Sequence, residues 1–172
     1  MMWQTAVIAL LFSCTMIAQT SSTNTLKHLR SAPLNSPLPR QRVNQFAKAA
    51  QRNDNDTDTR LLRLTEKHNN MTDHYLCCLH VNILDFYLHQ VMLPSEPLEI
   101  KYPISRTVTE DLHRIAKDLK ICMTKNGKYD RHLHTFKEEY KKLGRQGQTK
   151  ALGELDILFE YLTRFCREKR SQ

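Results

Sequence analysis

The chain has 172 residues, a formal net charge of +8, and only 4 glycines and 6 prolines. This length suits one domain that can bury a substantial core, and helical periodicity with few helix-breaking residues favours an all-α fold. The charge indicates attraction to sulfated glycans or anionic membranes and argues against a nucleic-acid partner, because aromatic residues are not interleaved with the basic ones as base stacking requires.

The first 22 residues have the features of a secretory signal peptide. They contain no charged side chain, and an apolar run extends from Ala6 to about Ala18. We expect cleavage between Ala18 and Ser22, which would make the protein secreted and extracellular. A membrane anchor is the alternative, although the run is short for a span. No later segment approaches the roughly 20 apolar residues that a membrane-spanning helix needs, so we do not expect a membrane-embedded protein.

Residues 23–42 are predicted to form a flexible N-terminal leader, because they lack apolar periodicity and contain three prolines close together. A helical domain is expected over residues 43–166. Its first helix has apolar side chains at helical spacing over residues 43–50 and ends in the polar run of residues 53–58.

The region after the first helix is polar and then briefly apolar. Asn55 and Asn70 each begin an N-x-Thr sequon, which predicts glycosylation of exposed loops in a secreted protein. Leu61, Leu62 and Leu64 suggest a short second helix.

A long third helix is predicted for residues 73–93, where two adjacent apolar stripes indicate a broad buried surface. Three prolines within residues 94–103 exclude regular helix from the linker that follows. A capping box formed by Thr107 and Glu110 predicts the start of a fourth helix, whose apolar stripe extends to Cys122.

Two more helices are predicted before the carboxy terminus. The fifth covers residues 129–143, with Gly144 well suited to follow its end, and the sixth is expected to begin after an N-cap at Thr149. The sixth has a stripe that should be buried: Leu152, Leu155, Phe159, Leu162 and Cys166. Six helices with short connections predict an up-and-down type bundle. The basic tail of residues 167–172 is expected to fray.

Cysteine usage predicts two disulfide bonds. Cleavage of the signal peptide would remove Cys14 and leave four thiols: Cys77, Cys78, Cys122 and Cys166. Four thiols in a secreted chain allow three connectivities. The adjacent residues Cys77 and Cys78 almost never pair with each other because the geometry is strained, so two connectivities stay open. The absence of a CxxC pair from the sequence argues against a zinc site.

The sequence contains none of the common catalytic motifs, such as GxSxG, a P-loop or HExxH. The most suggestive ligand group is His132, His134 and Glu138, but a solvated helix face is the preferred interpretation because no third ligand joins His134 and Glu138. Glu154 and Asp156 point to different sides of their helix, so they make a poor acid and base pair. We therefore predict no enzymatic activity, no metal and no cofactor.

Three segments resemble sequences of the interleukin-10 cytokine family. They are KKLGRQGQTKALGELDILFEYL at residues 141–162, FAKAAQRNDNDTDTRLL at residues 46–62 and CLHVNILDFYLHQVMLP at residues 78–94. The resemblance implies the six-helix class II cytokine bundle over residues 43–166. It also implies that Cys77 pairs with Cys166, and with it that Cys78 pairs with Cys122.

The resemblance further implies a cytokine that pairs two class II cytokine receptor chains, one of them the shared interleukin-10 receptor beta chain. Such pairing would trigger JAK-STAT signalling and epithelial barrier and antimicrobial defence. The face for the high-affinity chain would combine the loop after the first helix with the last helix. Receptor contact is then expected at Asp54, Thr57, Asp58, Thr59, Arg60, Lys150 and Glu154. On the residues alone, the aspartates would cap turns and Lys150 would be solvated.

A monomer is expected, because the short loop of residues 144–148 favours packing of the last helix on its own chain. Two alternative functions stay open. The first is a cationic secreted protein that binds glycans or acts as an antimicrobial, which the net charge and a basic cluster suggest: Lys137, Lys141, Lys142, Arg145 and Lys150. The second is another member of the same cytokine family.

Overall fold

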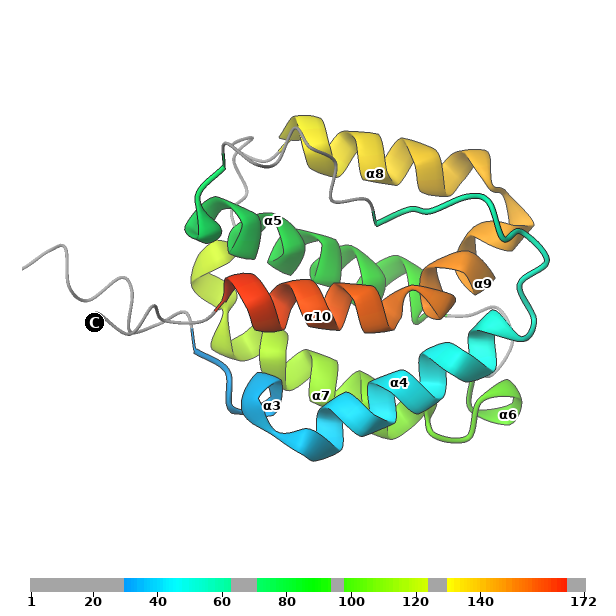
Figure 1. Cartoon of the computed structure of the whole chain (residues 1–172), viewed down its shortest axis with the longest axis horizontal. Helices are drawn as coiled ribbons and strands as arrows, with labels where there is room; N and C mark the ends of the chain where they lie inside the picture. The colour runs from blue at the N-terminus through cyan, green and yellow to red at the C-terminus, as the bar shows by residue number, and fades with distance from the viewer. Residues whose placement is uncertain (1–29, 63–70, 94–97, 124–129, 167–172) are drawn as a thin grey trace, which may run out of the picture.

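The computed structural model describes residues 30–62, 71–93, 98–123 and 130–166, and these ranges are helical without a β-strand (Figure 1). The elements are α3 (Ala32–Asn35), α4 (Pro37–Gln51), α5 (Asp73–Phe86), the π-helical turn η2 (Tyr87–Val91), α6 (Leu98–Lys101), α7 (Ser105–Asp118), the 3-10 turn η3 (Lys120–Cys122), α8 (Asp130–Lys142), α9 (Arg145–Gly153) and α10 (Leu155–Phe165). The all-α prediction is confirmed. None of the helices in these ranges has the length and apolar character to cross a membrane.

The last helical segment, α9 with α10, occupies the centre of the bundle. Figure 1 shows α10 between α5 and α4, with α7 against α4 and α8 against α5. The stripe predicted to be buried is at most 4% exposed at each position: Leu152, Leu155, Phe159, Leu162 and Cys166. Burial of each such Leu or Phe side chain stabilises the fold by about 1.5 to 3 kcal/mol. The bundle is therefore organised around this segment.

The prediction of a flexible leader over residues 23–42 is wrong for its second half. The short helix α3 and the first turns of α4 lie there, each with a proline at its start, where a missing backbone N–H costs nothing. Ser31 and Leu34 are buried, and the Ser31 hydroxyl donates to Asp118 at 2.8 Å. The three prolines of this region therefore lie in the first turns of two helices rather than prevent them. Residues 23–29 lie outside the described ranges.

Three local predictions of helix boundaries also change. The fourth predicted helix, α7, begins at Ser105, so Thr107 lies inside it and no capping box forms at its start. The proline-containing linker includes the short helix α6. Leu61 and Leu62 form a bend rather than a second helix, and Leu64 lies outside the described residues.

The predicted sixth helix is longer than expected and is interrupted. It starts at Arg145 rather than after Thr149, and it consists of α9 and α10, which meet at Glu154. Gly144 has a φ of 54°, a left-handed value that suits glycine, so its predicted place after the fifth helix is confirmed. A Cβ on Gly147 would lie 2.7 Å from the Tyr140 carbonyl oxygen. Glycine at this position therefore lets α9 approach α8 closely.

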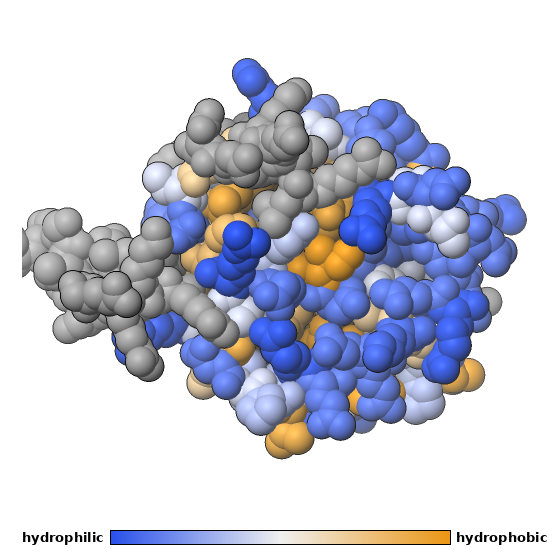
Figure 2. All heavy atoms as spheres, in the orientation of Figure 1, coloured by the Kyte–Doolittle hydropathy of each residue, from blue (hydrophilic) through white to orange (hydrophobic). Residues whose placement is uncertain are grey.

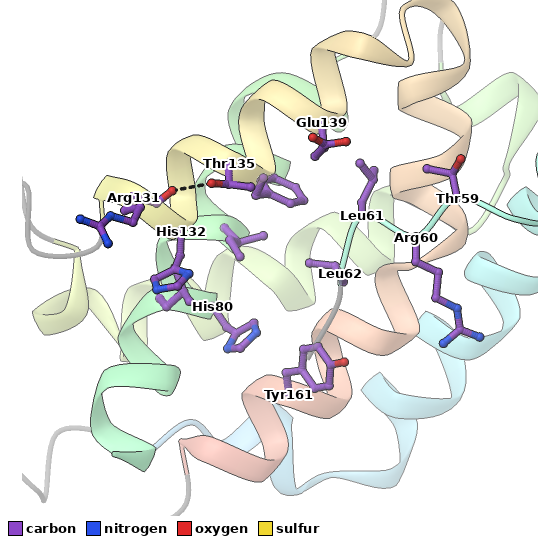
Figure 3. A pocket seen from close by; sticks show the side chains of 13 residues that line it. Thr59, Arg60, Leu61, Leu62, His80, Arg131, His132, Thr135, Glu139 and Tyr161 are labelled. Carbon is purple, nitrogen blue, oxygen red and sulfur yellow. Dashed lines mark hydrogen bonds between the residues drawn. The ribbon is translucent and has the colours of Figure 1, made fainter. Parts of the chain in front are cut away.

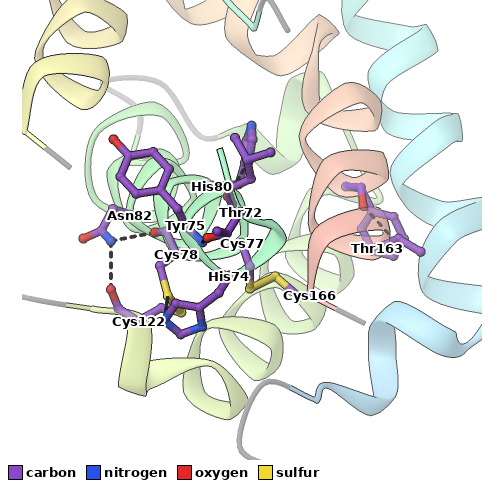
Figure 4. The surroundings of a disulfide bond; sticks show 12 residues. Thr72, His74, Tyr75, Cys77, Cys78, His80, Asn82, Cys122, Thr163 and Cys166 are labelled. Carbon is purple, nitrogen blue, oxygen red and sulfur yellow. Dashed lines mark hydrogen bonds between the residues drawn. A yellow bond between two sulfur atoms is a disulfide. The ribbon is translucent and has the colours of Figure 1, made fainter. Parts of the chain in front are cut away.

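Both expected disulfides are present (Figure 4). Cys77 pairs with Cys166 and joins α5 to the end of α10, whereas Cys78 pairs with Cys122 and joins α5 to η3. The Asn82 side chain donates to the Cys122 carbonyl oxygen at 2.9 Å. Two adjacent cysteines on α5 thus attach this helix to two different neighbours.

Candidate functional site

The loop that follows α4, residues 53–62, is held in shape by its own aspartates. The Asp54 carboxylate accepts a hydrogen bond from the Asp56 amide at 3.1 Å. The Asp56 carboxylate accepts from the amides of Asp58 at 3.0 Å and Thr59 at 2.9 Å. Hydrogen bonds from the Thr59 side chain and amide, and to a smaller extent from the Asp58 amide, lower the pKa of Asp56 below its ordinary value. Aspartates satisfy backbone amides in turns in this way, so the loop has a defined path without belonging to a helix or strand.

Lys150 of α9 binds the first half of this loop. Its side chain is 5% exposed, and its ammonium lies 2.6 Å from the Asp54 carboxylate, which is itself 11% exposed. The same ammonium donates to the main-chain carbonyl oxygen of Asp56. A positive charge buried this far needs such partners, because an unpaired buried ion is costly. Lys150 therefore fixes the loop to the last helical segment.

Glu154, at the junction of α9 and α10, binds the second half of the loop. Its carboxylate accepts from the Leu61 amide at 3.0 Å and from the Leu62 amide at 2.8 Å. Glu154 is 6% exposed, and its burial raises the pKa of its carboxyl above the ordinary value. The two backbone hydrogen bonds and the nearby Lys150 oppose that rise. One carboxylate thus satisfies two buried amides that no regular secondary structure would pair.

These positions change the expected role of two residues. Lys150 and Glu154 are expected to contact a receptor, and in the structure both are buried against the loop. The other five expected contact residues all lie in the loop. Three of these five are exposed, namely Thr57, Asp58 and Arg60. The other two, Asp54 and Thr59, are partly buried.

Asp56 is the residue of this site that the sequence interpretation did not single out. It provides the turn hydrogen bonds described above and the carbonyl oxygen that Lys150 binds. Its signal was present in the alternation of Asp54, Asp56 and Asp58, because aspartates two residues apart are typical of consecutive turns. That pattern predicts shape rather than contact.

A cavity of about 560 Å³ lies beside the loop, between it and helices α5, α8 and α10 (Figure 3). Its apolar lining comes from all of these elements except α10: Leu61, Leu62, Leu79, Ile83 and Phe136. Figure 3 also shows polar side chains around it, among them Arg60, His132 and Tyr161. In the space-filling view, apolar side chains are visible in the centre of a largely hydrophilic face (Figure 2). The cavity adjoins the second half of the loop, where Glu154 holds it.

The described residues contain no group of three side chains that could hold a metal ion. Glu138, the carboxylate considered with His134, instead pairs with Lys141 at 2.9 Å, and this bond lowers the pKa of Glu138. Lys142 pairs with Glu139 at 2.7 Å. Three lysines of the basic cluster, including Lys150, therefore have carboxylate partners, which weakens the cluster as an anion-binding surface.

One predicted glycosylation site lies on the same loop. Asn55 is exposed between Asp54 and Asp56, so its side chain is accessible to a modifying enzyme. The second sequon begins at Asn70, which lies outside the described residues.

Comparison with known proteins gives consistent results. The family model described as "Interleukin 22 IL-10-related T-cell-derived-inducible factor" matches residues 27–166. Human interleukin-22 is 32% identical over 133 residues, which are 76% of this chain and 72% of the human protein. Mouse interleukin-22b is 29% identical over 145 residues, 83% of this chain and 79% of the mouse protein. The crystal structure of zebrafish IL-22 superposes with a TM-score of 0.67 and 26% identity, covering 81% of this chain and 98% of that one.

Proposed function

The chain belongs to the interleukin-22 family and is therefore a cytokine of the interleukin-10 family, and from this premise we propose that it is secreted and acts by pairing two receptor chains. The receptor chains are the interleukin-22 receptor subunit and the shared interleukin-10 receptor beta chain. Their pairing activates JAK-STAT signalling and epithelial barrier and antimicrobial defence. Family membership supports this proposal, as does the apolar, uncharged segment at residues 1–22, which suits a signal peptide.

A protein of this kind acts through surface complementarity and catalyses no reaction. Its relatives are signalling ligands rather than enzymes. Binding energy in such interfaces is concentrated in a few residues on a well-ordered surface. The proposed function therefore needs an exposed surface that is already ordered before the receptor binds.

The loop of residues 53–62 has these properties, and this is the observation that carries the proposal. Thr57, Asp58 and Arg60 are exposed, and Thr59 is partly exposed, so these four form the proposed contact with the interleukin-22 receptor subunit. The loop is bound to the last helical segment by buried polar groups, which lowers the ordering cost of binding. The more buried residues among those expected to contact the receptor would then support recognition through the shape of the loop. They are Asp54, Lys150 and Glu154.

Two further features complete the proposal. The mature protein is a monomer, in keeping with the packing of α9 and α10 on helices of the same chain. N-linked glycans at Asn55 and Asn70 would follow from secretion. A glycan at Asn55 would stand beside the proposed contact residues, so its occupancy should be determined by mass spectrometry before affinities are compared.

The test is binding of the mature protein to the ectodomain of the interleukin-22 receptor subunit at physiological salt and at severalfold higher salt. Asp58→Ala should weaken binding about tenfold, a typical effect of losing a contact residue in an interface. Asp85→Ala is a matched control, because Asp85 is an aspartate on α5, outside the loop, whose side chain is 48% exposed. The control should bind as the unaltered protein does. Equal affinities of the two variants would contradict the proposed contact surface.

The salt series separates this function from that of a cationic glycan-binding or antimicrobial protein. Attraction to anionic glycans falls steeply as salt screens charge, whereas a packed interface mostly persists. The pairing of Lys141 and Lys142 with neighbouring glutamates favours the receptor-binding function. Binding to sulfated glycans alone, abolished by salt, would favour the cationic alternative.

A further inference from the structure

The backbone changes register where α9 meets α10. The Glu154 amide donates both to the Lys150 carbonyl oxygen and to the Ala151 carbonyl oxygen, each at 3.1 Å. The Ile157 amide donates to the Glu154 carbonyl oxygen at 3.1 Å, three residues back instead of the four of an α-helix. Such a local tightening interrupts the helix at Glu154. Glu154, which holds the second half of the loop, lies at this interruption, and Lys150, which holds the first half, lies about one turn before it.

Two side chains from distant elements bind the carbonyl groups at this junction. The Gln51 side-chain amide, at the end of α4, donates to the Gly153 carbonyl oxygen at 2.6 Å. The Tyr87 hydroxyl, in η2, donates to the Ala151 carbonyl oxygen at 3.0 Å. Tyr87 is fully buried, and its burial raises the pKa of its hydroxyl well above the ordinary value, so it stays a donor. Both bonds thus hold the junction from outside the last helical segment.

Gly153 permits the close approach of the Gln51 side chain to this junction. A Cβ at this position would lie 3.2 Å from the Gln51 Cγ atom. That distance is tighter than ordinary van der Waals contact, so at a larger residue the Gln51 side chain would have to move by a few tenths of an ångström. Glycine within a helix is otherwise unfavourable. Its presence here is explained by the approach of Gln51.

We infer that Gln51 and Tyr87 are positioning residues for receptor recognition, an inference that rests on the proposed function. Each binds a carbonyl group one residue away from a side chain that holds the loop: Ala151 follows Lys150, and Gly153 precedes Glu154. The contact of Lys150 with the Asp54 carboxylate and the bonds of Glu154 with the Leu61 and Leu62 amides are 2.6 to 3.0 Å long. A displacement of the junction by about 1 Å would stretch these beyond hydrogen-bonding distance. Gln51 and Tyr87 therefore act on the receptor through the position of the loop, without touching the receptor themselves.

The test removes each donor while keeping the size of its side chain. Tyr87→Phe deletes only the hydroxyl, and Gln51→Met keeps a chain of similar length without the amide. Thr163→Val is the matched control, because the Thr163 hydroxyl is also buried and donates to a main-chain carbonyl, that of Phe159 at 2.8 Å, within α10. Three quantities are measured for each variant: thermal stability, hydrogen exchange of the Leu61 and Leu62 amides, and the rate of dissociation from the interleukin-22 receptor ectodomain.

We expect Tyr87→Phe and Gln51→Met to speed exchange of the Leu61 and Leu62 amides and receptor dissociation by about three- to tenfold, the effect of one lost hydrogen bond. Thr163→Val should lower thermal stability similarly while leaving both rates unchanged. Unchanged exchange or dissociation in the two variants, or equal changes in the control, would overturn the inference. If the unaltered protein does not bind the ectodomain, the proposed function fails instead. Amide exchange then still decides whether Gln51 and Tyr87 position the loop.

Discussion

The last helical segment is attached to the rest of the molecule in two different ways at its two ends. At the end of α10, Cys166 forms a covalent bond to Cys77 of α5. Where α9 joins α10, Lys150 and Glu154 attach the loop of residues 53–62 through an ion pair and hydrogen bonds. Both attachments join segments about 90 residues apart in the chain. One end is therefore fixed by a bond that does not depend on charge or protonation of side chains, and the other depends on both.

Because of this difference, the two ends are expected to contribute differently to the stability of the fold and to receptor recognition. A disulfide stabilises the whole fold by restricting the unfolded chain, wherever in the native structure it lies. An ion pair and a few hydrogen bonds contribute less to stability, but they determine the local shape of the surface that they hold. The exposed residues of the proposed receptor contact lie at the end held by polar groups. Substitutions at the disulfide end should thus change stability most, and those at the polar end should change binding most.

Removal of the disulfide between Cys77 and Cys166 is expected to have the largest effect on stability. The two cysteines are 89 residues apart, so loop-closure entropy predicts a loss of about 4 to 5 kcal/mol for the pair Cys77→Ala and Cys166→Ala. This corresponds to a fall in the melting temperature of about 8 to 20 °C. Calorimetry of the variant would measure it. At a temperature where the variant is folded, its affinity for the receptor ectodomain should stay within about twofold of the unaltered protein. A large loss of affinity with an intact fold would contradict the separation of the two ends.

The disulfide end was largely predictable from the sequence. The stripe from Leu152 to Cys166 has the spacing of one helix face, and its burial follows from that pattern alone. The residues left two connectivities open, and the family resemblance implied the one observed. Local periodicity was sufficient here because the helix would bury the same face against any apolar neighbour.

The polar end was not predictable in the same way. Lys150 and Glu154 have the composition of a solvated helix surface, and their partners lie more than 90 residues earlier in the chain. The carbonyl groups beside the interruption at Glu154 are bonded by Gln51 and Tyr87, which no local pattern connects to α9 or α10. The start of α4 was missed for a different reason. Its prolines suit the first turn of a helix as well as they suit an extended leader.

The ion pair between Lys150 and Asp54 provides the second test of the comparison. Lys150→Met keeps most of the side-chain volume but leaves the Asp54 carboxylate without its cation. Loss of one partner of a buried pair predicts a destabilisation of about 3 kcal/mol, toward the lower end of the usual range because Asp54 is 11% exposed. Urea denaturation would measure this value.

Asp54→Asn is the control that identifies the pair as the cause. The destabilisation of the double variant should be clearly smaller than the sum of the destabilisations of the two single variants, because each substitution removes the same interaction. Receptor binding should weaken in all three variants, since the loop loses its attachment to α9. Additive effects on stability, or undiminished binding by Lys150→Met, would show that this ion pair does not determine the shape of the loop.

The smallest expected effect, and the most specific, is a difference between two carboxyl groups that act on the same loop. Burial raises the pKa of Glu154 above 4.5, whereas hydrogen bonds from Thr59 lower the pKa of Asp56 below 3.8. The stability that Asp56 contributes is therefore present above pH 3.8 and lost as the pH falls through its lowered pKa. The pH dependence that Glu154 contributes has the opposite sign: its contribution to stability is complete below pH 4.5 and lost as the pH rises through its raised pKa.

NMR titration should show the Leu61 and Leu62 amides following Glu154 above pH 4.5. The amides of Asp58 and Thr59 should follow Asp56 below pH 3.8. Lys150→Met should raise both pKa values, because the ammonium favours both carboxylates. A single shared midpoint for the four amides would mean that the loop opens as one unit, and Lys150 and Glu154 would then not hold its two halves separately.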